Sequence, residues 1–123
     1  MSLLLDTDIL IDYLRQAEKE TLFTKICKKH STLYISGITI TELWAGKSIE
    51  KKMEKQKAER LLGKLKIVIA NTKISKKAGD LLRKYQQFTI ADALIAATAI
   101  DKKTKLATFN KKHFENIKGL KLL

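Results

Sequence analysis

Apolar residues recur along the chain in short continuous runs that alternate with stretches of helical spacing. The first run, residues 3–5, consists of three leucines and is typical of a strand buried on both faces. We expect further strands at residues 31–36, 66–70 and 105–108, where β-branched, aromatic and other apolar residues gather. Residues 120–123 are expected to add an edge strand.

The stretches between these runs carry apolar residues at helical spacing. They predict helices over residues 7–15, 17–29, 39–45, 48–64, 72–87 and 91–101, and a loop with one helical turn over residues 109–117. Residues 91–101 are apolar nearly all round, which indicates a buried central helix. Gly37 is expected to act as the breaker after the second strand.

Alternating strands and helices favour an α/β protein. We expect a single domain over residues 1–123, with a mostly parallel central sheet of four to five strands in a three-layer α/β/α sandwich. Ligands of such sheets bind outside the carboxyl ends of the strands. Asp6 follows the first strand directly and is therefore a site candidate, although Asp6, Thr7 or Asp8 also suits the N-cap of the next helix.

Three acidic residues stand in apolar or uncharged surroundings: Asp6, Glu42 and Asp92. If the parallel sheet brings them to one edge, their mutual repulsion calls for a divalent cation, and hard oxygen ligands suit Mg²⁺ or Mn²⁺. Such an ion supports hydrolysis of phosphodiesters. The alternatives are that Asp92 is a helix N-cap and that Glu42 is a partly buried helix residue bonded to the backbone.

The charge of the chain points to polyanionic partners. There are 25 basic and 13 acidic residues, which gives a net charge of +12. A lysine-rich host proteome is the alternative source of this excess. The single cysteine excludes an internal disulfide, and no segment has the pattern of a signal peptide or membrane span, so we expect a soluble, cytoplasmic protein with no membrane partner.

Four motifs in order resemble those of PIN-domain ribonucleases, in particular VapC-type toxins of toxin–antitoxin pairs. They are LLDTDILIDYL around Asp6, SGITITELWAG around Glu42, IADALIAATA around Asp92, and LATFNKKHFENIKGL from residue 106. The resemblance implies an α/β sandwich, Mg²⁺- or Mn²⁺-dependent endoribonuclease activity on RNA, homodimerisation and inhibition by a cognate antitoxin. It matches Asp6, Glu42 and Asp92 to the acidic metal-site residues, which serve as catalytic residues.

The last motif departs from the family pattern. Where the family commonly has Thr-x-Asn-x-x-Asp/Glu-Phe, this chain keeps Thr108 and Asn110 but has His113 in place of the acid. Histidine accepts Mn²⁺ better than Mg²⁺, and it is also able to contact phosphate or carry a proton. A site that holds one metal ion at rest is equally compatible with this change.

Further residues are assigned supporting roles. Thr7, Asp8, Thr108, Asn110 and His113 are expected to surround the metal ligands or position the substrate, with Asp8 as a helix cap or a neighbour of the ligands. The adjacent pair Lys111 and Lys112 is expected to bind the RNA backbone. Trp44, the only tryptophan, is assigned to core or dimer packing rather than to base stacking.

Two other functions fit parts of the pattern. Asp6 and Asp8 after an apolar strand mimic the nucleophile and acid of haloacid-dehalogenase-like phosphatases, but Ile9 and Leu10 stand where that group has a Gly-Thr turn. A non-catalytic PIN-like protein that binds nucleic acid or an antitoxin is the second alternative, and His113 is its only support. The sequence does not reveal the RNA target, the cleaved bond or the preferred metal.

Overall fold

Four parallel strands form a sheet in the order β3-β2-β1-β4, with β1 at its centre. The computed structural model describes residues 2–16 and 19–123. Its strands are β1 (Ser2–Leu5), β2 (Thr32–Ser36), β3 (Lys66–Val68) and β4 (Lys105–Ala107). Its helices are α1 (Thr7–Arg15), α2 (Leu22–Lys29), α3 (Gly37–Trp44), α4 (Lys52–Leu62), α5 (Thr72–Lys84), α6 (Ile90–Lys102), α7 (Lys111–Phe114) and the 3₁₀ helix η1 (Lys47–Glu50).

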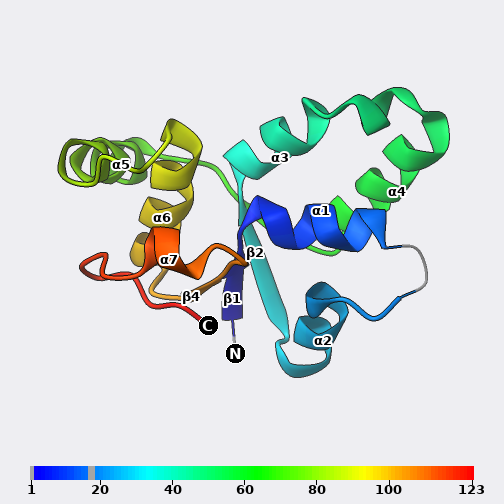
Figure 1. The fold of residues 1–123 in the computed structure, drawn as a ribbon, viewed down its shortest axis with the longest axis horizontal. Helices are drawn as coiled ribbons and strands as arrows, with labels where there is room; N and C mark the ends of the chain where they lie inside the picture. The colour runs from blue at the N-terminus through cyan, green and yellow to red at the C-terminus, as the bar shows by residue number, and fades with distance from the viewer. Residues whose placement is uncertain (1, 17–18) are drawn as a thin grey trace.

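The two faces of β1 pack into two separate cores. Leu3 and Leu5 face a cluster that includes residues of α1, α2 and α4, whereas Leu4 faces a cluster built mainly by α5 and α6. Successive side chains of a strand point to opposite faces, so a strand covered on both sides reads as a continuous apolar run. Figure 1 shows the two groups of helices on either side of the sheet, which confirms the three-layer arrangement.

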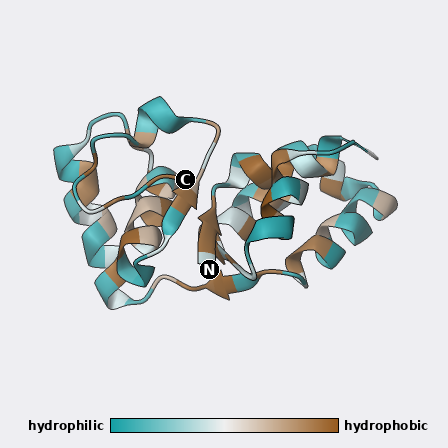
Figure 2. Cartoon of the chain, turned by 90° about the horizontal axis from the view of Figure 1, so that it is seen from below, coloured by the Kyte–Doolittle hydropathy of each residue, from teal (hydrophilic) through white to brown (hydrophobic). Residues whose placement is uncertain are grey.

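Hydropathy follows the same layers. In Figure 2 the central strands are mostly hydrophobic, and the helices turn hydrophilic residues outward. Helix α6 is the exception, since Ala93 and the continuous stretch from Ile95 to Ala99 are all buried. This confirms the prediction of a buried central helix. Among the described residues, no helix is both long and apolar enough to cross a membrane.

Several predicted boundaries need correction. The second helix begins at Leu22, because Thr21 and Thr24 close a capping box there; residues 19–21 are not helical, and residues 17–18 lie outside the described part. The second strand ends at Ser36, before Gly37 as predicted, but Gly37 is already the first residue of α3, so this helix begins two residues before the expected Thr39 and is capped by Ser36. A Cβ atom at Gly37 would lie 3.1 Å from Ile69 Cδ1, so the small residue permits this close approach.

Two further elements differ in length from the prediction. The stretch 48–64 is not one helix: η1 ends at Glu50, Lys51 is extended, and α4 starts at Lys52. The expected edge strand at residues 120–123 is reduced to a single parallel bridge between Leu106 and Leu122. The structure therefore has four strands, the lower end of the predicted range, within the part of the chain that it describes.

Candidate active site

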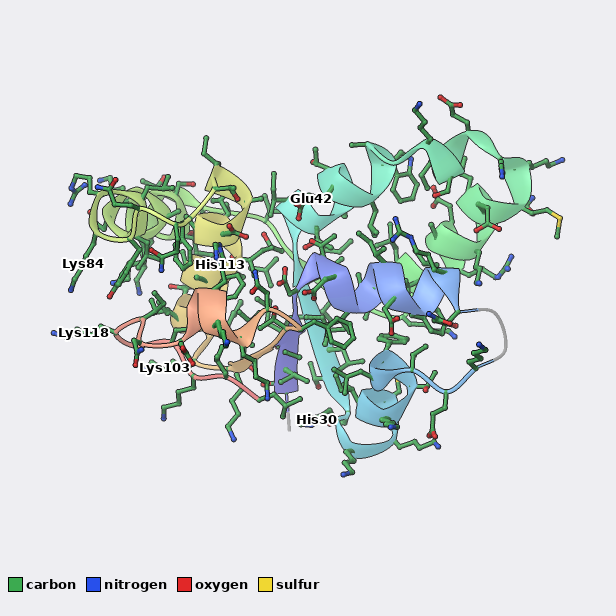
Figure 3. The ribbon with its side chains drawn as sticks, in the orientation of Figure 1. His30, Glu42, Lys84, Lys103, His113 and Lys118 are labelled. Atoms are coloured by element: carbon green, nitrogen blue, oxygen red, sulfur yellow. The ribbon has the colours of Figure 1, made fainter. Side chains whose placement is uncertain are left out.

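The predicted site residues gather at the carboxyl ends of the parallel strands. Asp6 follows β1, Thr108 follows β4, and Ser36 at the end of β2 leads into α3, which carries Glu42. Figure 3 shows Glu42 and His113 near this end of the sheet, on elements from opposite sides, while His30 lies at the other end. These residues lie where ligands of open α/β sheets commonly bind.

Asp6 is held at three points in a nearly dry environment. The residue is only 8% exposed. Its Oδ1 accepts the Thr7 N–H at 2.8 Å, which makes Asp6 the N-cap of α1, and its Oδ2 accepts the Thr108 hydroxyl at 2.7 Å. Its own N–H donates to the Ala107 carbonyl oxygen at 2.9 Å. Capping and membership of the site are therefore two roles of one carboxylate.

Asp8, two residues after Asp6 and the second residue of α1, faces the same hydroxyl. Its Oδ2 accepts the Phe109 N–H at 3.2 Å and lies 3.4 Å from the Thr108 hydroxyl oxygen. Its Oδ1 is buried and has no hydrogen-bond partner within the described residues. A buried carboxylate oxygen without a partner is costly, so this atom marks a place where a cation or a donor would be stabilising.

Burial and repulsion raise the pKa of both carboxyls. For Asp6 the pKa rises to about 6, first because burial removes water and next because the Asp8 charge is close; Asp92 adds a smaller repulsion. The bonds from Thr108 and Thr7 oppose this rise only in part. Burial also raises the pKa of Asp8, with a smaller contribution from Glu42. A nearby cation would favour the charged forms of both groups.

Glu42 is tied to α1 through a threonine. The Thr7 hydroxyl donates to Glu42 Oε1 at 2.6 Å, and the Thr39 hydroxyl oxygen lies 3.0 Å from the same Thr7 oxygen. The Glu42 residue is exposed, so it is not the partly buried, backbone-bonded residue of the alternative interpretation. The bond fixes α3 against the start of α1 and turns the carboxylate toward the end of the sheet.

Asp92 is paired with His113. Asp92 Oδ2 lies 2.8 Å from His113 Nε2, and the two side chains are 23% and 24% exposed. The same Oδ2 accepts the Thr89 N–H at 3.0 Å in a capping box, in which Thr89 rather than Asp92 is the N-cap of α6. The imidazole ring packs between Phe88 and Phe114, with centroids 5.6 and 5.5 Å away.

The donor set has the chemistry of a site for a hard divalent cation, although it is not gathered as a complete cage. Carboxylate oxygens are the ligands that Mg²⁺ and Mn²⁺ prefer, and the unpartnered Asp8 Oδ1 adds a donor that sequence reasoning had assigned to a cap or a neighbour. In residues 2–16 and 19–123, no three acidic, histidine or cysteine side chains lie close enough to share one ion. A bound ion would therefore need water or phosphate oxygens as well, as Mg²⁺ commonly does.

The remaining predicted residues lie on the loop after β4. The Asn110 N–H donates to the Thr108 hydroxyl oxygen at 3.0 Å, so the backbone of Asn110 supports the residue that bonds Asp6. The Asn110 side chain makes no cap bond to α7. Lys111 and Lys112 are exposed at the start of α7. Sequence reasoning missed Thr39 and Phe109, whose types carry no signal beyond their positions beside predicted site residues.

Comparison with known proteins identifies relatives over nearly the whole chain. The sequence pattern of the PIN domain matches residues 3–120. Ribonuclease VapC10 of Mycobacterium tuberculosis is 32% identical over 123 residues, covering 97% of this chain and 90% of that protein.

Solved structures with this fold are also similar over their full length. VapBC2 from Rickettsia felis, bound to a DNA fragment from its promoter, matches with a TM-score of 0.83 and 26% identity, covering 100% of this chain and 98% of that one. A toxin–antitoxin complex from Klebsiella pneumoniae matches with a TM-score of 0.79 and 28% identity, covering 95% and 93% of the two chains.

Proposed function

The chain belongs to the PIN-domain family, as a homologue of the VapC ribonucleases, and on that premise we propose that it is a metal-dependent endoribonuclease toxin. Its substrate is RNA, and its activity is neutralised by a cognate antitoxin. The single observation that carries the proposal is the carboxylate pair at the carboxyl end of β1, in which Asp6 is buried and Asp8 is half-buried. The two charges repel each other, and within the described residues Asp8 Oδ1 is buried without a hydrogen-bond partner.

The acidic residues would hold Mg²⁺ or Mn²⁺. Asp6 and Asp92 are the proposed main ligands, Glu42 completes the acidic pocket, and Asp8 Oδ1 supplies a further oxygen. When bound, such an ion activates water and neutralises charge on phosphate oxygens. Burial disfavours the charged forms of Asp6 and Asp8 and so raises the pKa of both. These charged forms are the ones that bind a cation, so a bound ion would stabilise them.

The neighbouring side chains position the acids. The Thr108 hydroxyl orients Asp6, and the Thr7 hydroxyl orients Glu42 as the group that aligns or deprotonates the attacking water. His113, through Nε2, orients Asp92 and leaves the other carboxylate oxygen of Asp92 for the cation. His113 is thus proposed as a positioning residue rather than as a ligand.

Substrate binding rests on the charge of the chain. A net charge of +12 attracts a phosphate backbone, and Lys111 and Lys112 are exposed next to the site. The acids at the sheet edge would repel RNA without a cation, so the lysines and the cation act together. This arrangement predicts that RNA binding weakens as the salt concentration rises.

A groove beside Glu42 supports the proposal of a protein inhibitor. It has a volume of about 470 Å³, lies between α1, α3, η1 and α4, and has Ile11, Leu14 and Ile49 in its wall with Arg15 and Lys57 also lining it. An amphipathic antitoxin helix with acidic flanks would fit this combination. Ile49→Glu should then abolish capture of the antitoxin in co-purification while RNA cleavage persists. Homodimerisation, which the family implies, is a further part of the proposal.

The decisive experiment is incubation of the purified protein with total cellular RNA in Mg²⁺ or Mn²⁺. We expect new RNA ends that are absent in EDTA and strongly reduced for Asp6→Asn and Asp92→Asn. Mapping the ends identifies the target and the cleaved bond. Cleavage that persists in EDTA would refute the metal dependence.

The second candidate is a PIN-like protein that binds RNA or an antitoxin without cleaving. It is favoured by one observation, the engagement of Asp92 with His113 in place of a fourth acid. In the same assay this protein would bind RNA but generate no ends with either metal. The haloacid-dehalogenase-like alternative does not fit a chain whose residues 3–120 match the PIN domain.

A further inference from the structure

Phe109 differs from the other phenylalanines of the chain. The sequence contains four, and Phe23, Phe88 and Phe114 are between 1% and 7% exposed, whereas Phe109 is 53% exposed. An exposed aromatic ring forgoes the burial that normally stabilises this side chain. It is therefore a candidate for contact with a binding partner.

The backbone around Phe109 is fixed to the acidic site on both sides. Its N–H donates to Asp8 Oδ2 at 3.2 Å, and the preceding residue, Thr108, is buried and bonded to Asp6. The following residue, Asn110, donates its N–H back to the Thr108 hydroxyl oxygen at 3.0 Å. The exposed ring therefore starts from a backbone that the site's own carboxylates hold in place.

We propose that the Phe109 ring is a stacking platform for one base of the RNA that the site cleaves, and this inference rests on the proposed function. Proteins recognise single-stranded RNA by stacking unpaired bases on aromatic rings, with basic side chains on the phosphates. Phe109 is followed directly by Asn110 and then by exposed Lys111 and Lys112. The ring, the lysines and the acids thus form one contiguous site for base, phosphate and scissile bond.

The position of Phe109 favours RNA over the other partners. It follows β4 beside Asp6 and Asp8, whereas the apolar groove proposed for the antitoxin is lined by residues of α1, α3, η1 and α4 and does not include it. Trp44, which the sequence analysis assigned to packing rather than to base stacking, is half-buried and packs against the core on the α1 side. Phe109 is therefore the better-placed aromatic residue for contact with a base.

The test measures RNA binding apart from cleavage. Fluorescence anisotropy with a fluorescein-labelled single-stranded oligoribonucleotide, taken from a mapped cleavage site, reports Kd for variants made in an Asp6→Asn background with Mg²⁺. We expect Phe109→Ala to raise Kd roughly 5- to 100-fold, the usual effect of removing one stacking ring. Phe109→Tyr and Phe109→Trp should keep Kd near that of the background protein. Phe109→Leu, which is apolar but has no ring, should behave like Phe109→Ala.

Two controls separate stacking from general effects. Met53→Ala removes another exposed apolar side chain, 79% exposed on α4, and should leave Kd unchanged. A series of oligoribonucleotides with a single abasic nucleotide at successive positions locates the stacked base. When the abasic nucleotide takes the place of the stacked base, the background protein and its Phe109→Ala variant should bind with the same Kd, because the base that stacks is absent.

The outcomes also distinguish failure of this inference from failure of the proposed function. If the wild-type protein cleaves RNA but Phe109→Ala leaves Kd unchanged on every oligoribonucleotide, the stacking inference is wrong and the nuclease proposal stands. Stacking would also be overturned if Phe109→Ala raised Kd but Phe109→Leu kept Kd near that of the background protein. The same conclusion would follow if the effect of Phe109→Ala on Kd persisted at every abasic position. The same holds if Phe109→Ala disrupts antitoxin capture while RNA binding is retained. If the wild-type protein binds RNA and never cleaves it, the proposed function fails, and the stacking test is made instead with a labelled single-stranded oligoribonucleotide of mixed sequence.

Discussion

Asp6, Asp8 and Thr108 form the part of the site that the sheet builds, whereas Glu42, Asp92 and His113 form the part that the helices build. We call these the buried half and the open half. In the buried half two carboxylates lie side by side with raised pKa values, and one oxygen lacks a partner. In the open half each carboxylate already has a neutral or basic side chain beside it, namely Thr7 for Glu42 and His113 for Asp92.

This difference suggests how the two halves divide the work. The buried half is preorganised and electrostatically unfavourable, so it gains most from a cation. The open half is more exposed, and its carboxylates already accept hydrogen bonds or pair with neighbouring side chains. A bound ligand is able to replace these interactions. We therefore expect removal of a carboxylate charge from the buried half to change stability and activity in opposite directions, and substitutions in the open half to change mainly metal affinity and activity.

The largest effect is expected for Asp6→Asn. Cleavage should fall by roughly 10²-fold or more, since losing even an outer partner of a metal ligand costs 10- to 100-fold. The metal-free protein should become more stable at pH 7, because a pKa raised from 3.8 to about 6 corresponds to up to about 3 kcal/mol. Urea unfolding in EDTA and the RNA cleavage assay measure the two effects.

Glu59→Gln is the control for this prediction, because it removes an exposed acid on α4. It should change neither activity nor stability measurably. If Asp6→Asn instead lowered stability in EDTA at pH 7, its cap bond to α1 would outweigh the repulsion, and the contrast between the halves would be lost.

In the open half, His113→Ala should weaken binding of Mn²⁺ or Mg²⁺ by about 10- to 100-fold, the usual effect of removing the group that orients a ligand. His113→Gln keeps an N–H donor at similar reach and should restore most of the affinity. Isothermal titration calorimetry without RNA measures both. Equal loss in the two variants would indicate that the ring packing with Phe88 and Phe114 matters rather than the bond to Asp92.

A smaller effect is expected for Thr108→Val, which has nearly the shape of threonine but no hydroxyl. It should lower the free energy of unfolding by about 1–3 kcal/mol at pH 7, because the buried Asp6 carboxylate loses a donor. Thr98→Val is a matched control, since Thr98 is fully buried but its hydroxyl bonds a helix carbonyl, that of Leu94. If the two variants lowered the free energy of unfolding equally, the charge of Asp6 would not strengthen the bond that Thr108 donates to it.

The smallest effect is a shift in titration. Asp8→Asn removes a negative charge beside Asp6 and should lower the pKa of Asp6 without returning it to its ordinary value, because burial remains the larger cause. Carboxyl ¹³C NMR of the metal-free protein measures the pKa directly. An unchanged pKa would mean that the two carboxylates of the buried half do not interact.

The same shift fixes the sign of the pH dependence of stability. A pKa that is higher in the folded state favours the protonated form, so the contribution of Asp6 to stability is complete below pH 3.8. It is lost as the pH rises through about 6. Added Mg²⁺ should consequently raise Tm more at pH 7.5 than at pH 5, where protons compete for the carboxylate.

Periodicity predicted the elements well where burial is uniform along them. The leucines of β1 and the stretch Ile95–Ala99 of α6 are buried on all sides, so their patterns are continuous and unambiguous. The break at Lys51 was not predicted because the charged stretch 48–64 contains no proline, and its only glycine, Gly63, lies near its end. Local sequence does not mark a break that depends on how α4 packs.

The site was predicted in part for similar reasons. A parallel sheet brings the residues that follow its strands to one edge, which made Asp6 a candidate from its position alone. Asp92 follows no strand and was a candidate as an acid at the start of an apolar helix. Capping α1 does not remove Asp6 from the candidate site, because one of its oxygens bonds Thr7 and the other bonds Thr108. The unpartnered oxygen of Asp8 and the exposure of Phe109 depend on distances between β1 and the loop after β4, and sequence spacing does not encode them.

The bond between Thr108 and Asp6 joins residues 102 positions apart. Because β4 pairs with β1, a ribosome must synthesise residues 105–107 before this edge of the sheet can close. Contacts of such large sequence separation form late and slowly in folding. A growing polypeptide therefore carries Asp6 without the hydroxyl that orients it, and a nuclease built this way would remain inactive toward the RNA around it until β4 and Thr108 have left the ribosome.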